Sequence, residues 1–157
     1  MMNLRNFCCL SLKLAMVVAA TGCGQSGPKL HPVQGTVLVN KKPAAEAIVF
    51  LHRKGRTGLE EQVPYGKADK GGSFKITNGN SGEGAPEGEY TITVYWPDMS
   101  KSEDGNGGRP DALNGAYDKV TQSKLSYVVK AGQNTIPPLE LVPGVAKGTV
   151  APNPNDK

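Results

Sequence analysis

Histidine is scarce in this chain, and the residue patterns of several enzyme classes are missing. Neither His31 nor His52 is followed three positions later by glutamate, so neither begins the His-x-x-Glu pair of a zinc peptidase. The sequence also lacks a Gly-x-Ser-x-Gly nucleophile motif, a phosphate-binding loop and a dinucleotide-binding glycine pattern. We therefore expect a protein that is not an enzyme and that uses no metal and no cofactor.

Cysteine is limited to Cys8, Cys9 and Cys23, and no strong excess of charge is present. The 18 basic residues, less Arg5 and Lys13 of the N-terminal segment discussed next, leave 16 against 14 acidic residues, a net charge of +2. The basic residues are scattered and form no stripe with aromatic residues, which argues against a nucleic-acid partner.

The N-terminus has the three parts of a secretory signal. Residues 1–13 carry two basic residues and no acidic one, residues 14–20 are apolar, and the small residues Thr21 and Gly22 follow. The apolar run is far shorter than the ~20 residues that span a bilayer as a helix. Residues 1–22 are thus predicted to be a signal peptide, with Cys8 and Cys9 inside it.

The end of this segment resembles the lipobox of bacterial lipoproteins, with the sequence Ala20-Thr21-Gly22-Cys23. The resemblance implies that Cys23 is acylated and becomes the first residue of a protein held by that lipid in the cell envelope, facing the periplasm or the cell surface. Gly24 follows Cys23, and by resemblance to the sorting rule of well-studied bacteria this favours the outer membrane. A plain signal peptide that leaves a free thiol is the alternative.

The remaining chain has a period of two and almost no helical period. Short segments with alternating or apolar residues are separated by turn signals, and we expect seven strands, at residues 33–39, 47–52, 65–68, 73–77, 88–96, 124–130 and 136–142. This pattern predicts an all-β fold, a seven-stranded antiparallel Greek-key β-sandwich. Residues 23–30 are interpreted as a tether, 31–142 as the sandwich domain and 143–157 as a disordered tail.

The predicted sandwich carries these motifs in order: Val33-x-Gly35-x-Val37, Lys42-Pro43-Ala44, Asp69-x-x-Gly72-x-Phe74, Gly88-x-Tyr90-x-Ile92-x-Val94, Asp111-x-Leu113-x-Gly115-x-Tyr117 and Val129-x-x-Gly132-x-Asn134. Their order resembles the carboxypeptidase regulatory-like (transthyretin-like) domains and small lipoproteins of planctomycetes. Glu46 departs from the family, which often has glycine before the second strand. The resemblance implies a prealbumin-like sandwich and no reaction; the transthyretin-like hydrolases of purine breakdown carry several active-site histidines and a C-terminal Tyr-Arg-Gly-Ser that this chain lacks.

A long polar segment, residues 97–123, interrupts the strand rhythm, and loops of this length are usually functional or disordered. It concentrates oxygen ligands, but their spacing matches no known calcium loop: Asp98, Glu103, Asp104, Asn106 and Asp111. Trp96, Tyr95 and Tyr117 are possible ligand-binding residues, since aromatic rings stack on apolar ligand faces, although core packing is the competing interpretation.

The sequence thus favours a non-catalytic, lipid-anchored envelope protein, a structural or interaction module whose partners are the membrane, through Cys23, and an unknown envelope protein or polysaccharide. Two alternatives stay open. One is a carbohydrate-binding module that uses Trp96 and the neighbouring tyrosines. The other is an enzyme of unrecognised type.

Overall fold

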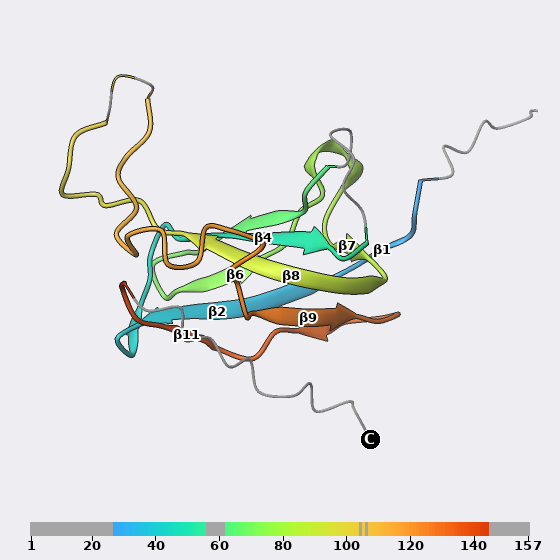
Figure 1. The fold of residues 1–157 in the computed structure, drawn as a ribbon. Coiled ribbons are helices and arrows are strands. Elements are labelled where there is room, and N and C mark those ends of the chain that lie inside the picture. The colour runs from blue at the N-terminus through green and yellow to red at the C-terminus, as the bar shows by residue number, and fades with distance from the viewer. Residues whose placement is uncertain (1–26, 56–61, 104, 106, 145–157) are drawn as a thin grey trace, which may run out of the picture.

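The structure is a computed structural model that describes residues 27–55, 62–103, 105 and 107–144 (Figure 1). The predicted signal peptide, Cys23 and residues 145–157 of the predicted tail lie outside the described residues. Within the described residues, no helix is long and apolar enough to cross a membrane. The secondary structure there consists of short strands and a single 3-10 turn, η1 (Gly79–Ser81).

The first large sheet is built around β2 (Val33–Val39). Along β2, the antiparallel partners are β3 (Lys42–Pro43) and β6 (Ser73–Lys75). Its parallel partners are β10 (Asn134–Thr135) and β11 (Leu139–Leu141), so the start and the end of the domain lie side by side.

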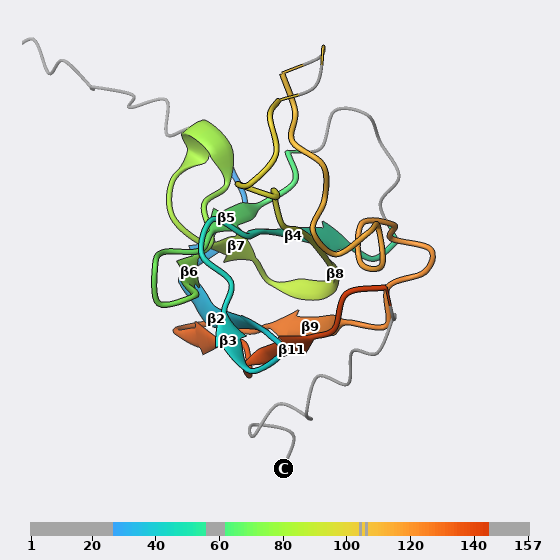
Figure 2. The same cartoon turned by 90° about the vertical axis from the view of Figure 1, so that its left-hand side faces the viewer.

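The second large sheet has the order β5 (Tyr65–Lys67), β4 (Ile48–Arg53), β8 (Gly88–Tyr95) and β9 (Ser126–Val129), all antiparallel. A small third sheet pairs β1 (Leu30–His31) with β7 (Ala85–Pro86). Figure 1 shows β4 and β8 in one layer and β2 and β11 in the other, and Figure 2 shows the same layers after a 90° turn.

The core lies between the two layers and follows from the alternation of the strands. In β8, Tyr90, Ile92 and Val94 are at most 1% exposed, because every second side chain of a strand faces the same side. Apolar residues from β2, β4, β9 and β11 meet them: Val33, Val37, Val39, Val49, Leu51, Val129, Leu139 and Leu141. Burial of such side chains contributes roughly 1.5–3 kcal/mol each and holds the two layers together.

The structure confirms the all-β sandwich and refines its strands. The described residues contain eleven strands, including short pairs at β1, β3 and β7 that the sequence pattern does not predict. The predicted strand at 136–142 forms only at Leu139–Leu141, because Pro137 and Pro138 carry no backbone N–H for a ladder. β10 and β11 pair with β2 in parallel, whereas the strand pattern of the sequence predicts antiparallel pairing throughout.

Candidate functional site

The predicted aromatic site is not assembled as an exposed platform. Tyr117 is 2% exposed and belongs to the core, because the segment after residue 111 folds back across β8, where Val94 N–H donates to Tyr117 O at 2.9 Å. Trp96 is half-buried against the core, and its indole N–H donates to Ala45 O at 2.9 Å. The Tyr95 hydroxyl donates to Arg109 O. The interpretation of Tyr117 as a ligand residue is therefore corrected to a core role, since its ring offers no face to solvent.

The carboxylates of the long loop serve the loop itself. Asp111 accepts backbone hydrogen bonds from Trp96 and Leu113 at Oδ1, at 3.0 and 3.1 Å, and from Gly115 at Oδ2, at 2.8 Å. Asp98 Oδ1 accepts hydrogen bonds from the hydroxyl of Ser100 at 2.6 Å and from the Ser100 backbone N–H at 3.1 Å. These hydrogen bonds lower the pKa of the Asp98 carboxyl. Asp104 and Asn106 lie outside the described residues. No three His, Cys, Asp or Glu side chains of the described ranges gather as a metal-binding group.

The two histidines lie at separate places and each contacts a different structural partner. His31 is 5% exposed, and its Nδ1 accepts a hydrogen bond from Gly132 N–H at 2.9 Å. His52 lies on β4, with its Nε2 2.8 Å from Thr93 Oγ1. Burial lowers the pKa of His52 below its ordinary value, so this ring favours the neutral form.

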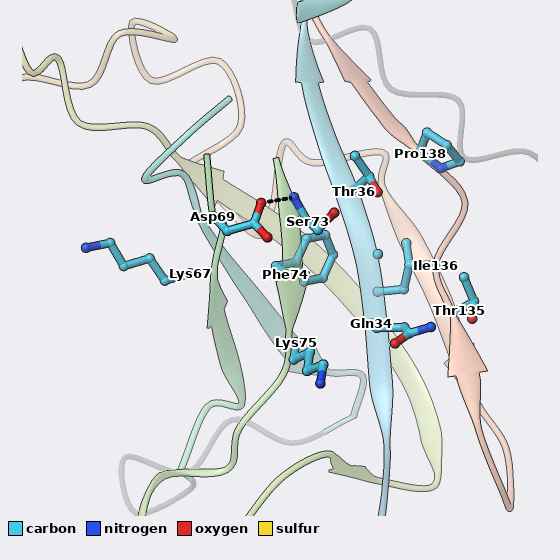
Figure 3. Close-up of a pocket in the computed structure, with 11 residues that line it drawn as sticks. Gln34, Thr36, Lys67, Asp69, Ser73, Phe74, Lys75, Thr135, Ile136 and Pro138 are labelled. Atoms are coloured by element: carbon cyan, nitrogen blue, oxygen red, sulfur yellow. Dashed lines mark hydrogen bonds between the residues drawn. The ribbon is translucent and has the colours of Figure 1, made fainter. Parts of the chain in front are cut away.

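A hollow of about 560 Å³ lies on the outer face of the β2 sheet (Figure 3). The alternation of β2 places Gln34 and Thr36 on this face, while Val33 and Val37 are buried in the core. The ladder register sets Lys75 of β6 opposite Gln34 and Ser73 opposite Thr36, and Thr135 of β10 lies beside Gln34 on the other side. Three strands that are distant in sequence thus bring their polar side chains to one surface.

The polar groups of this hollow are not used by the fold. Within the part of the chain that the structure describes, five lining side chains make no hydrogen bond or ion pair: Gln34, Thr36, Ser73, Lys75 and Thr135. They offer one amide, three hydroxyls and one ammonium, which together donate and accept hydrogen bonds with a single formal charge.

The rim and floor of the hollow are fixed by local contacts. At the rim, Asp69 Oδ1 accepts from the backbone N–H groups of Gly71 at 2.8 Å and Ser73 at 3.0 Å, which holds the turn before β6. Lys67 is paired with Glu46 and points away from the turn. Phe74 and Ile136 are 3% and 1% exposed and form an apolar floor. The arrangement is a fixed surface with free hydrogen-bonding groups, suited to binding.

Sequence reasoning did not single out the hollow, although part of its signal is visible. The alternation at 33–39 and 73–77 marks Gln34, Thr36, Ser73 and Lys75 as outward-facing positions. The register that places these positions opposite one another, and that adds Thr135 from β10, is set by tertiary pairing.

Comparison with known proteins gives no matching family model and no matching curated protein. Among solved structures, 5-hydroxyisourate hydrolase of Klebsiella pneumoniae is 16% identical with a TM-score of 0.41, over 78% of this chain and 99% of that one. (S)-Allantoin synthase is 15% identical with a TM-score of 0.39, over 78% of this chain and 44% of that one. A 9R-lipoxygenase of Cyanothece PCC8801 is 17% identical with a TM-score of 0.34, over 84% of this chain and 20% of that one.

These three similarities carry no argument about what this chain does, because none exceeds 17% identity or a TM-score of 0.41. The assignment to the carboxypeptidase regulatory-like lipoproteins stays a prediction from the sequence motifs.

Proposed function

We propose that this chain is a lipid-anchored, non-catalytic binding domain of the bacterial cell envelope, of the carboxypeptidase regulatory-like type, and that the hollow on β6, β2 and β10 binds a hydroxyl-rich polymer. One observation carries the proposal: five polar side chains converge on this hollow and none is engaged within the described fold.

The chemistry of the hollow favours a polysaccharide. A sugar chain presents many hydroxyl groups, each of which donates and accepts hydrogen bonds, and the amide of Gln34 and the hydroxyls of Thr36, Ser73 and Thr135 match that property. The charge of Lys75 adds tolerance for an acidic polymer.

The small number of titratable groups in the hollow supports the non-catalytic part of the proposal. Asp69 is the one acidic residue among the side chains that line the hollow, and one of its oxygens is held by backbone N–H groups. No histidine lines the hollow, and among the described residues no second carboxylate faces Asp69 across it. A paired acid and base, which general acid–base catalysis requires, is not assembled at this site.

The binding proposal is tested with the full chain purified from bacterial membranes and mixed with isolated envelope polysaccharide. Thr36→Val replaces a hydroxyl by a methyl group of the same shape, and Ser73→Ala removes a second hydroxyl. Each net hydrogen bond contributes about 1 kcal/mol, so each variant is expected to weaken binding about fivefold. Thr91→Val on β8, in the other sheet, is the matched control and leaves binding unchanged.

Equal binding by wild type, Thr36→Val and Ser73→Ala would show that the polymer does not use the hollow. If no envelope polysaccharide binds at all while an envelope protein binds and loses affinity in Thr36→Val, the partner class is a protein and the polymer assignment is wrong.

The anchor is tested separately by mass spectrometry and membrane fractionation. The proposal expects the mature chain to begin at Cys23 with a diacylglycerol mass on its thiol, and Cys23→Ser to leave the membrane fraction. An unmodified Cys23 would refute the anchor and would leave the hollow to be judged by its own binding experiment.

A further inference from the structure

A second hollow, of about 400 Å³, lies at the end of the sandwich where the described chain begins. It is lined by residues from four places in the sequence, among them Lys29 before β1, Arg53 at the end of β4, Glu87 between β7 and β8, and Ala131 after β9. Figure 1 shows that β1 and β7 lie at this end, and that the long loop after β8 lies at the opposite end.

Two cationic side chains of this hollow have no anionic partner among the described residues. Lys29 is exposed and makes no ion pair there. The guanidinium of Arg53 donates from Nη2 to the backbone oxygen of Glu87 at 2.8 Å, which fixes its direction without neutralising its charge. A backbone carbonyl carries no formal charge, so Arg53 keeps a full positive charge and further N–H donors for a ligand.

Glu87 carries the one carboxylate of the hollow, and this carboxylate lies beside the His31 ring, with its Oε1 3.7 Å from His31 Nε2. The other ring nitrogen, Nδ1, accepts a hydrogen bond from the Gly132 N–H. In the neutral ring the proton is therefore on Nε2, which faces Glu87. Nearby, Lys54 and Glu89 form an ion pair at 3.4 Å, so their opposite charges cancel. Lys29 and Arg53 therefore outweigh Glu87, and the cationic side chains of the hollow exceed its single carboxylate.

We propose that this hollow binds the phosphate of an anionic membrane lipid through Lys29 and Arg53, and so holds the domain on the bilayer by its β1 end. The inference rests on the proposed lipid at Cys23. Lys29 follows Cys23 by six residues, which span at most about 20 Å when fully extended, so the lipid keeps this end close to the headgroups. Basic side chains at an anionic surface attract it over a distance of about one Debye length, ~8 Å in physiological salt.

Docking by this end has a consequence for the rest of the domain. The loop that begins at Pro97 lies at the far end of the sandwich and would point away from the membrane. The hollow on the outer face of the β2 sheet lies along the side of the domain and stays open to a polymer.

The test uses the full acylated chain in vesicles of phosphatidylcholine, with or without phosphatidylglycerol, followed by hydrogen–deuterium exchange. The inference expects slower exchange at residues 28–31 and 131–133 when phosphatidylglycerol is present, and unchanged exchange at residues 97–103. Each basic residue at an anionic surface contributes about fivefold to the ratio of docked to undocked domain. Lys29→Gln and Arg53→Gln should each lower that ratio about fivefold, and Glu87→Gln should raise it.

The matched control is Lys42→Gln, which removes the same charge from β3 in the β2 sheet, outside the hollow. Because Arg53 also holds the backbone of Glu87, Lys29→Gln is the decisive variant. Equal effects of Lys29→Gln and Lys42→Gln, or protection that does not depend on phosphatidylglycerol, would overturn the docking site alone. Release of the chain from pure phosphatidylcholine vesicles would instead overturn the anchor, and the docking inference with it.

Discussion

Phe74 occupies the space that a side chain on Gly35 would need. The two residues are paired on neighbouring strands, and a Cβ added to Gly35 would lie 2.6 Å from Cζ of the Phe74 ring. Ile136 approaches the same point, with its Cβ at 3.1 Å. The ring is 3% exposed, so the absence of a side chain at position 35 lets an aromatic residue fill the layer beneath the polar hollow.

Gly35→Ala is therefore expected to destabilise the domain. The Phe74 ring has to move, and overpacking of a core costs typically 1–3 kcal/mol. We expect the free energy of unfolding in urea to fall by about 2 kcal/mol. Gly105→Ala is the matched control, because a Cβ there meets nothing within 4 Å. A Gly35→Ala protein as stable as wild type would show that the ring relaxes without cost.

A second variant tests the cause of that loss. Combining Gly35→Ala with Phe74→Leu supplies room for the new methyl group, so the double variant should lose less stability than the two single changes added together. Additive losses would mean that the clash with Phe74 does not cause the effect of Gly35→Ala.

Local pattern predicts the strands where one face of the sheet is buried. Residues 88–96 alternate between apolar and polar residues, and β8 forms at Gly88–Tyr95 because Tyr90, Ile92 and Val94 enter the core together. The turn at 69–72 also follows from its residues, since Asp69 accepts two backbone hydrogen bonds and Gly72 has a φ of +77°.

Long-range placement is the part that local pattern does not contain. The parallel pairing of β11 with β2 joins residues about 100 positions apart, and nothing in either segment specifies the partner. A tyrosine such as Tyr117 suits a ligand-binding site and a protein core equally well. Tyr117 is buried because the segment around it folds back across Val94. The polar hollow has the same origin, because its side chains come from three strands.

The motif residue Asn134 supports the turn between β9 and β10. Its Oδ1 accepts from Lys130 N–H at 2.9 Å, and its Nδ2 donates to the backbone oxygens of Lys130 at 2.9 Å and Gly132 at 3.0 Å. Asn134→Ala removes three hydrogen bonds to the backbone of this turn, each contributing about 1 kcal/mol net, and we expect a loss of about 3 kcal/mol in thermal or urea unfolding. Asn80→Ala, at an exposed asparagine, should change stability by less than about 0.5 kcal/mol. Similar small losses in both variants would contradict a structural role for the Asn134 side chain.

Glu46 adopts a backbone conformation that favours glycine. Its φ is +69°, which costs a residue with a side chain roughly 1–2 kcal/mol, and the motif comparison expects glycine before this strand. Its ion pair with Lys67 joins two largely exposed side chains and contributes little. Glu46→Gly and Glu46→Ala both remove the ion pair, but only glycine relieves the backbone. We expect the free energy of unfolding of Glu46→Gly, measured in urea, to exceed that of Glu46→Ala by about 1 kcal/mol. Equal stability of the two variants would refute the strain at this position.

His52 is expected to make stability depend on pH. Burial lowers the pKa of the folded ring below the ordinary value of 6.5, so between the two pKa values the unfolded chain binds more protons than the folded one. The free energy of unfolding then rises with pH through this window. The contribution of His52 to this free energy is lost as the pH falls from about 6.5 toward the lowered pKa. Protonation also removes the acceptor role that neutral Nε2 can have toward Thr93 Oγ1, 2.8 Å away. Urea unfolding of wild type and His52→Gln at a series of pH values separates this contribution from those of other groups, since only the difference between the curves belongs to His52. The curves should converge as the pH falls through the window, and curves that stay parallel would show that His52 does not couple protonation to folding.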